Sequence, residues 1–201
     1  MKSVVFDVGN VLLDWQPHAP FRRYFVDDDA IEAFFDEVGF REWNLSLDAG
    51  RDWDEAIASL CSEYPHRSDL IKLFQTHWHE TVLGAIGPSV EVLLTLRERG
   101  DPVYAITNFA YPRWLEVCER FPFLQDSFSD VVVSGKEQLV KPGKDIFELF
   151  LDRNSLQAES CIFIDDSIAN VSTASSMNFD TIHFKPETDL IKELKERGYS
   201  L

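Results

Sequence analysis

The stretch SVVFDVGNVLLDW, residues 3–15, contains the first predicted strand of this chain. It opens with a short β-branched and apolar run, typical of a buried strand, and the run ends in Asp7. Gly9 follows two residues later. A carboxylate at the end of a strand with a glycine just beyond it indicates one of two things. It is either a tight turn, in which Gly9 supplies an unusual backbone conformation, or a functional site to which the rest of the chain sends partners.

Four further runs of the same kind follow, and helical patterns separate most of them. Nearly continuous hydrophobicity within a run is typical of parallel strands buried on both faces. Alternating strands and helices predict a doubly wound, Rossmann-like α/β fold with a parallel sheet. The predicted strands are residues 3–7, 102–107, 130–134, 161–165 and 180–184, and helices are predicted over 88–100, 143–154 and 188–198.

One interval interrupts this alternation. About 95 residues separate the first two predicted strands, far more than a crossover connection needs. Most of the interval, residues 16–82, is rich in Phe, Trp and charged residues and lacks strand-like runs. Helices are predicted there over 29–43, 51–64 and 68–80. We therefore expect a core domain made of residues 1–15 and 83–201, and an inserted α-helical cap over 16–82.

The composition excludes several classes of partner. The chain has 201 residues, and 35 acidic against 19 basic residues give it a formal net charge of −16. Such a surface argues against sequence-independent binding of nucleic acid and against docking on an anionic membrane. A small phosphorylated substrate is compatible with it if positive charge is concentrated locally, for example by a divalent metal ion.

The sequence predicts a cytoplasmic protein that is a monomer or homodimer. The three cysteines are far apart and form no CxxC pair, which is typical of reduced, buried thiols. No apolar run approaches the roughly 18 residues of a membrane span. The apolar stretch near the N-terminus is also too short for a signal peptide.

Polar side chains stand where the predicted strands end, and the carboxyl ends of parallel strands form the ligand-binding edge of an open sheet. Carboxylates that meet there repel one another unless a cation neutralises them, and Mg²⁺ favours carboxylate, phosphate and water oxygens. The sequence therefore predicts a magnesium site at this edge. Its candidate residues, strand by strand, are Asp7; Thr107 and Asn108; Ser134 with Lys141 beyond it; and Asp165 and Asp166.

These residues resemble the four motifs of the haloacid dehalogenase superfamily, in the correct order over residues 3–170. The matching segments are VVFDVGNVL with Asp7, AITNF with Thr107, LVKPGKDIF with Lys141, and FIDDSIANV with Asp165, Asp166 and Asn170. Four motifs in order are far more specific than any one of them. The long insertion after the first motif resembles the helical cap of this superfamily.

The resemblance implies a hydrolase that transfers a phosphoryl group from a small metabolite to water. Asp7 would attack phosphorus and form an aspartyl-phosphate. Thr107 and Asn108 would bind the phosphoryl oxygens, and Lys141 would offset their charge in the transition state. The resemblance implies that Mg²⁺ is held by Asp7, the Gly9 carbonyl, Asp165 and Asp166.

Gly9 departs from the pattern of most phosphatases of the superfamily, which carry a second Asp at this position as general acid and base. The chain resembles a branch with Gly there that includes sugar-phosphate phosphatases, so a sugar phosphate is the expected substrate. Water or a cap residue must then handle the proton. Candidate cap residues are His18, His66, His77 and His79 for the proton and Arg22, Arg23, Arg41 and Arg51 for substrate; Trp15 is a candidate to face the site, and Trp43, Trp53 and Trp78 are expected in the cap's own core.

Two alternatives stay open. The first is a metal-independent 2-haloacid dehalogenase that uses the same Asp nucleophile. The pair Asp165–Asp166 argues against it, as does Phe147, because dehalogenases carry a Tyr six residues after the Lys. The second alternative is a catalytically weak binding or regulatory member of the fold. It is disfavoured because the nucleophile, the Lys and the metal carboxylates are all present.

Overall fold

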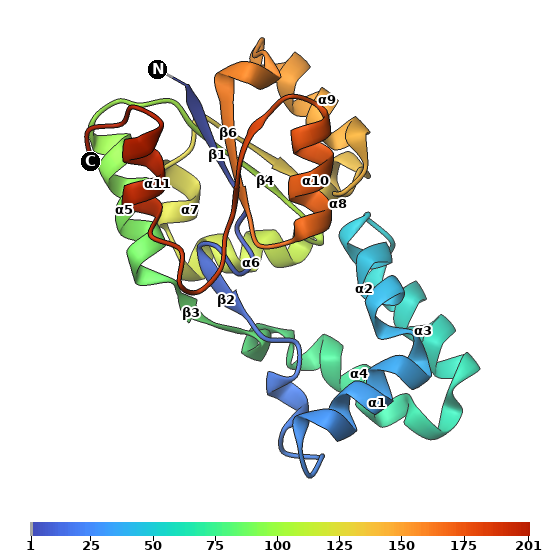
Figure 1. Cartoon of the computed structure of the whole chain (residues 1–201). Helices are drawn as coiled ribbons and strands as arrows, with labels where there is room; N and C mark the ends of the chain where they lie inside the picture. The colour runs from blue at the N-terminus through green and yellow to red at the C-terminus, as the bar shows by residue number, and fades with distance from the viewer. Residues whose placement is uncertain (1) are drawn as a thin grey trace.

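The computed structural model describes residues 2–201, and its centre is a five-stranded parallel sheet with helices on both faces (Figure 1). The strand order is β5-β4-β1-β6-β7. All five strands predicted from the sequence are present, so the doubly wound α/β fold is confirmed. Their bounds are β1 Ser3–Phe6, β4 Val103–Thr107, β5 Asp130–Val133, β6 Cys161–Asp165 and β7 Asp180–His183.

Successive strand residues point to opposite faces of the sheet, and helices cover both faces, so the side chains on both sides are buried. Val5 and Phe163 belong to one apolar cluster, with side chains of α9 (Lys144–Asn154) and α10 (Ile168–Ser176). Val4 and Ile162 belong to the other, with side chains of α5 (Gly87–Glu98) and α11 (Leu190–Glu196). This explains why the strands are apolar throughout rather than alternating.

Over the part of the chain that the structure describes, the core contains three helices that the sequence predicted and four that it did not. The predicted helices at 88–100, 143–154 and 188–198 correspond to α5, α9 and α11. The others are α6 Tyr111–Arg120, α7 Phe123–Asp126 and α8 Ser134–Glu137, and α10 was likewise not predicted. Across residues 2–201, no helix combines the length and the apolar character needed to cross a membrane.

A two-stranded antiparallel ribbon carries the inserted helices. It pairs β2 (Leu13–Trp15) with β3 (Val82–Ala85), and the sequence did not predict it because both strands are short. Between its strands lie α1 Asp28–Val38, α2 Phe40–Asp48, α3 Trp53–Glu63 and α4 Ser68–Thr76, with 3₁₀ turns at Ala19–Phe21, Pro65–Arg67 and Trp78–Thr81. These helices project away from the sheet (Figure 1).

The single helix predicted over 29–43 is wrong. Gly39 takes a left-handed conformation, with φ of 61°, and separates α1 from α2. Aromatic side chains hold the two helices together across this break: Phe40 stacks on Phe35 with ring centroids 4.0 Å apart, and Phe74 of α4 meets Phe40 edge to face. The break turns α2 toward the core domain, where it packs against α8.

Candidate active site

The ends of β1 and β6 bring two carboxylates to one lysine. Lys141 Nζ lies 2.9 Å from Asp7 Oδ1 and 2.7 Å from Asp165 Oδ2. Because β1 and β6 are neighbours, Asp7 and Asp165 leave the sheet side by side. All three side chains are buried, and a buried ammonium is tolerated only with partners of this kind.

Asp165 is fixed in place by further hydrogen bonds. Its Oδ1 accepts a hydrogen bond from Ser167 N at 2.8 Å. Asn170 Nδ2 lies 3.0 Å from Oδ1 and 3.1 Å from Oδ2 and donates to this carboxylate. Asp165 is therefore a rigid partner for Lys141, and Asn170, predicted only as part of a motif, orients it.

A third carboxylate, Asp166, completes a cluster of oxygen donors. Its Oδ2 accepts from Asn10 Nδ2 at 3.3 Å, and its main-chain oxygen accepts from His183 Nε2 at 3.0 Å. One carboxylate oxygen from each of Asp7, Asp165 and Asp166 lies within 4.8 Å of the other two. Three carboxylates against one ammonium leave excess negative charge, and such a set of hard oxygen donors fits Mg²⁺.

The pKa values of the cluster are shifted mainly by burial and further by the neighbouring charges. Burial raises the pKa of Asp7 to about 8, with Lys141 opposing the rise and Asp165 adding to it. Burial also raises the pKa of Asp166. Burial disfavours the Lys141 ammonium, but Asp165 and Asp7 outweigh it and raise the pKa of Lys141. Additional positive charge at the cluster would lower the pKa of Asp7 and favour its ionised, nucleophilic form.

The end of β4 supplies a hydroxyl and an amide with different surroundings. Thr107 is buried, and within residues 2–201 its Oγ1 has no hydrogen-bond partner. An unpaired buried hydroxyl costs about 1–3 kcal/mol, so this atom suits a ligand oxygen. The side chain of Asn108, by contrast, pairs with the main chain of Lys141: Nδ2 donates to the carbonyl and Oδ1 accepts from the amide, both at 2.9 Å. Asn108 therefore also fixes the loop that carries Lys141.

Ser134 stands at the end of β5 but does not line the site. Its Oγ accepts from Phe109 N at 2.8 Å and donates to the main-chain oxygen of Asp48 at 2.6 Å. Gly135 follows in a crowded position, where a Cβ would come within 2.6 Å of Tyr111 N. Ser134 and Gly135 thus hold the C-terminal end of α2 against the core domain.

The interpretation of Gly9 as a residue needed for an unusual backbone conformation is wrong. The left-handed residue of this turn is Asn10, with φ of 54°, and its Oδ1 accepts from Trp15 N at 3.1 Å. A Cβ placed on Gly9 would have no atom within 4 Å. The missing side chain therefore leaves open space beside Asp7.

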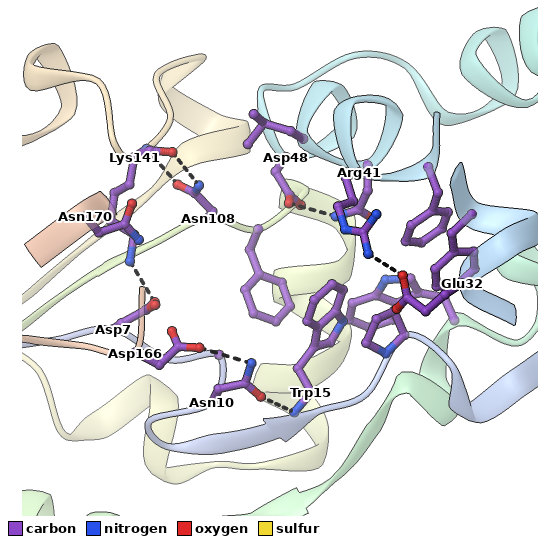
Figure 2. A pocket seen from close by; sticks show the side chains of 18 residues that line it. Asp7, Asn10, Trp15, Glu32, Arg41, Asp48, Asn108, Lys141, Asp166 and Asn170 are labelled. Atoms are coloured by element: carbon purple, nitrogen blue, oxygen red, sulfur yellow. Dashed lines mark hydrogen bonds and ion pairs between the residues drawn. The ribbon is translucent and has the colours of Figure 1, made fainter. Parts of the chain in front are cut away.

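A cavity of about 430 Å³ lies between the carboxylate cluster and the inserted helices (Figure 2). One face of α2 forms much of its far wall, because residues three and four apart along a helix share a face. The core side is lined by Asp7, Gly9, Asn10, Asn108, Phe109, Lys141, Asp166 and Asn170; the other side is lined by Trp15, Pro17, Glu32, Phe35, Phe40, Arg41, Asn44, Leu45, Asp48 and Trp78.

Among the cap candidates from the sequence, Arg41 and Trp15 reach this cavity. Arg41 is paired there with Glu32 and, at 2.7 Å, with Asp36. Trp78 also lines it and meets Phe109 edge to face, so its expected place in the cap's own core is wrong. The remaining candidates do not line this cavity: Arg22, Arg23, Arg51, His18, His66, His77 and His79, along with Trp43 and Trp53, which pack on Phe74.

Asn10, Asn44 and Asp48 line the cavity although the sequence analysis did not select them. A signal for two of them was present. Asn44 and Asp48 stand three and seven residues after Arg41, which places all three on one helical face, beside the buried Trp43 and Leu47. A polar stripe of this kind is also typical of a solvated helix, so only the tertiary structure distinguishes the two.

The sequence of this chain is similar to those of known hydrolases and of two relatives. Residues 1–178 match the sequence profile of the haloacid dehalogenase-like hydrolases. The chain is 24% identical over 199 residues to the sesquiterpene phosphatase AstK of Aspergillus oryzae, which covers 97% of this chain and 95% of that protein. It is 33% identical over 210 residues to mouse acyl-CoA dehydrogenase family member 10, covering 96% of this chain but 19% of the mouse protein.

Solved structures share the fold. A haloacid dehalogenase family enzyme of Bacteroides thetaiotaomicron superposes with a TM-score of 0.77 at 21% identity, covering 96% of this chain and 98% of that one. A mutant of the same enzyme, in complex with magnesium and inorganic phosphate, superposes with a TM-score of 0.73 at 22% identity over 94% of this chain and 96% of that one. Together with the profile match over most of its length, this shows that the chain belongs to the haloacid dehalogenase-like hydrolase family.

Proposed function

We propose that the chain is a Mg²⁺-dependent phosphatase that hydrolyses a small phosphomonoester through an aspartyl-phosphate on Asp7. The observation that carries this proposal is the position of Asp7. It is paired with Lys141, belongs to the cluster of three carboxylates and lines the cavity. The names of two relatives support it, because one is a sesquiterpene phosphatase and the other was crystallised with magnesium and inorganic phosphate.

The metal would be held by carboxylate oxygens of Asp7, Asp165 and Asp166 together with the Gly9 carbonyl. When bound, it would offset the charge of the phosphoryl oxygens and of the cluster itself. The residues fit this group because the cluster offers only oxygen donors within 4.8 Å and because a single ammonium does not neutralise it.

The chemistry then rests on residues of the core edge. An Asp7 carboxylate oxygen attacks phosphorus, the bond to the leaving oxygen breaks, and an aspartyl-phosphate forms. Lys141 holds Asp7 in line and stabilises the phosphoryl charge, while the free hydroxyl of Thr107 donates to a phosphoryl oxygen. Asn108 Nδ2 uses one hydrogen to hold the Lys141 main chain, and its second hydrogen donates to another phosphoryl oxygen. Water then attacks phosphorus and releases inorganic phosphate, which restores Asp7.

The inserted segment, residues 16–82, is proposed to act as a cap that selects the leaving group over a core of residues 1–15 and 83–201. Its contribution to the cavity is largely aromatic, with Phe35, Phe40 and Trp78, and includes the polar pair Glu32–Arg41. Such a wall suits a leaving group with an apolar face and a polar group. A sugar phosphate and an isoprenoid phosphate both meet this description.

The test is release of inorganic phosphate from a panel of sugar phosphates, isoprenoid phosphates, nucleotides and 4-nitrophenyl phosphate. Each substrate is assayed with Mg²⁺ and with EDTA, for wild type and Asp7→Asn. We expect release that requires Mg²⁺ and is lost in the variant. Halide release from 2-chloropropionate in EDTA would instead establish the dehalogenase alternative. Silence toward all substrates, together with capture of a protein partner, would favour the binding module.

A further inference from the structure

Departure of an alcohol from phosphorus requires a proton for its oxygen, and the core edge has no group free to supply it. Gly9 has no side chain, Lys141 is bound to two carboxylates, and Asp7 is the nucleophile of the proposed function. None of the four cap imidazoles lines the cavity. Within residues 2–201 the ionisable side chains that do line it are Asp7, Glu32, Arg41, Asp48, Lys141 and Asp166.

Asp48 differs from the other carboxylic acids of this cavity in its partners. Glu32 is paired with Arg41 and with His18, whose Nε2 lies 2.6 Å from Glu32 Oε1, so both of its carboxylate oxygens are engaged. Asp7 and Asp166 belong to the oxygen-donor cluster. Among the described residues, Asp48 forms no ion pair and makes hydrogen bonds only with neutral groups. A carboxyl with neutral partners can carry a proton at much lower cost than a salt-bridged one.

The position of Asp48 is set by contacts on both sides of the seam between cap and core. Its Oδ1 accepts from Ala110 N at 3.0 Å, and its Oδ2 accepts from Asn44 Nδ2 at 3.1 Å. Its main-chain oxygen accepts from Ser134 Oγ. Ala110 follows Asn108 by two residues in the loop beyond β4, so Asp48 lies over the loop proposed to bind the phosphoryl group. Figure 2 shows it reaching into the cavity from the side opposite Asp7 and Asp166.

Apart from Arg51, the charged groups on the elements packed around Asp48 are engaged with other partners. From α8, Glu137 pairs with Arg153, and Lys136 lies over the Tyr111 ring, 6.0 Å from its centroid. From α1, Glu32 and Asp36 pair with Arg41, and before α3, Asp52 caps the helix through Glu55 N. Arg51, three residues along the chain, is exposed.

Burial raises the pKa of Asp48 to about 7, and the hydrogen bond from the Ala110 amide opposes this rise. Both protonation states of Asp48 are therefore populated near neutral pH.

We propose that Asp48 is the proton donor and acceptor of the reaction, delivered by the cap to the leaving oxygen. The inference rests on the proposed phosphatase function. In the first step, Asp7 forms its bond to phosphorus, the leaving oxygen departs with the bonding electrons, and the Asp48 carboxyl proton moves to that oxygen. In the second step, the Asp48 carboxylate takes a proton from the water that attacks phosphorus, and the bond between phosphorus and Asp7 breaks. Asp48 is then protonated again.

The experiment compares two aryl phosphates of nearly equal shape, phenyl phosphate and 4-nitrophenyl phosphate, in wild type and Asp48→Asn. Phenolate is a poor leaving group that needs the proton, and nitrophenolate is a good one that does not. For phenyl phosphate we expect kcat/KM to fall by about 10²-fold, the lower end of what a positioned proton donor supplies. For 4-nitrophenyl phosphate we expect a fall of less than about threefold, because its leaving group needs little protonation.

The matched control is Ser134→Ala, which removes the hydroxyl that holds the Asp48 main chain and keeps the carboxyl. A purely structural role predicts that both variants change kcat/KM for the two substrates by the same factor. Equal losses in Asp48→Asn would therefore overturn the inference. Wild type that releases no phosphate from either substrate with Mg²⁺ would overturn the proposed function itself, which is a distinguishable result.

The wild type provides a second measurement that does not depend on a variant folding. The ratio of kcat/KM for phenyl phosphate to that for 4-nitrophenyl phosphate cancels the ionisation of Asp7, which both reactions share. Because the donor acts in its protonated form, we expect this ratio to fall as pH rises through about 7. A ratio that is independent of pH between 5 and 9 would contradict the proposal.

Discussion

The two walls of the cavity are built in different ways. The core wall is built around the ends of neighbouring parallel strands, which bring Asp7 and Asp165 together, and Asn108 fixes the loop that places Lys141 within hydrogen-bonding distance of both. The cap wall is one face of α2, whose Arg41, Asn44 and Asp48 approach the core only because Gly39 turns the helix and Ser134 receives its end. In the function that we propose, the core determines which bond is broken, whereas the cap determines which molecule is accepted and how its oxygen is protonated.

Asp7→Asn, on the core wall, is expected to have the largest effect. The amide has nearly the same shape but cannot attack phosphorus, so kcat should fall by about 10³-fold or more. The measurement is steady-state phosphate release, with circular dichroism and thermal melting to show that the fold persists. The matched control is Asp14→Asn, since Asp14 hydrogen-bonds to Gln16 and does not line the cavity. A variant that kept a substantial share of wild-type turnover would remove Asp7 from its proposed role.

Lys141→Met tests whether the same wall also stabilises the fold. The substitution leaves Asp7 and Asp165 buried together without their cation, and removing one partner of a buried ion pair costs about 3–5 kcal/mol. Chemical denaturation should show this loss, and Mg²⁺ should restore part of it. A variant as stable as wild type in EDTA would show that the cluster does not need the ammonium.

The sequence predicted the core wall much better than the cap wall, and the reason is geometric. A parallel sheet brings its strand ends to one edge, so the position of Asp7 after one apolar run and of Asp165 after another was enough to place them together. Asp48 lies on α2, whose direction depends on the left-handed Gly39 and on the contact of its C-terminal end with Ser134 and Gly135. These are tertiary contacts that the spacing of residues on α2 does not contain.

Two structural features of the core could also not be predicted from the sequence. The short strands β2 and β3 lack enough residues for a readable alternation, so the ribbon that carries the cap was not predicted. The reciprocal pairing of the Asn108 amide with the Lys141 main chain requires loops after different strands to meet. In both cases, long-range pairing rather than local propensity decides the structure.

Asp166→Asn is expected to weaken the metal site more than the chemistry. Asp166 is half-buried beside Asn10 and does not contact Lys141, so its loss should raise the Mg²⁺ concentration needed for half-maximal activity about 10- to 100-fold. Titration of phosphate release with Mg²⁺ measures this. Asp145→Asn on the surface of α9 is the control. An unchanged Mg²⁺ response would place the metal away from this cluster.

On the cap wall, Leu45→Ala should change selection without changing the chemical step. Leu45 is 39% exposed and lines the cavity, so truncation costs little stability but removes apolar contact with the leaving group. KM for a bulky apolar phosphomonoester should rise about tenfold, with kcat nearly unchanged. Leu83→Ala, at an exposed position of the ribbon away from the cavity, is the control. A fall in kcat with KM unaltered would contradict a selective role for this wall.

The smallest effect concerns stability as a function of pH. The folded pKa of Asp48, about 7, lies above its ordinary value of 3.8, so the folded state binds the proton more tightly and loses stability as pH rises from about 4 through 7. Asp48→Asn lacks this loss. Relative to wild type, its free energy of unfolding should gain about 1–2 kcal/mol between pH 4 and pH 8, less than the full shift implies because the side chain is partly exposed. Parallel denaturation curves at both pH values would contradict this expectation.

The covalent role proposed for Asp7 can be measured directly by acid quenching during turnover. Enzyme, Mg²⁺ and an active phosphomonoester are mixed, quenched within milliseconds and digested, and the peptides are mapped by mass spectrometry. We expect a phosphoryl group on the peptide that carries Asp7, present during turnover and absent from Asp7→Asn. Phosphate release in which no peptide, or a different peptide, becomes phosphorylated would contradict this role.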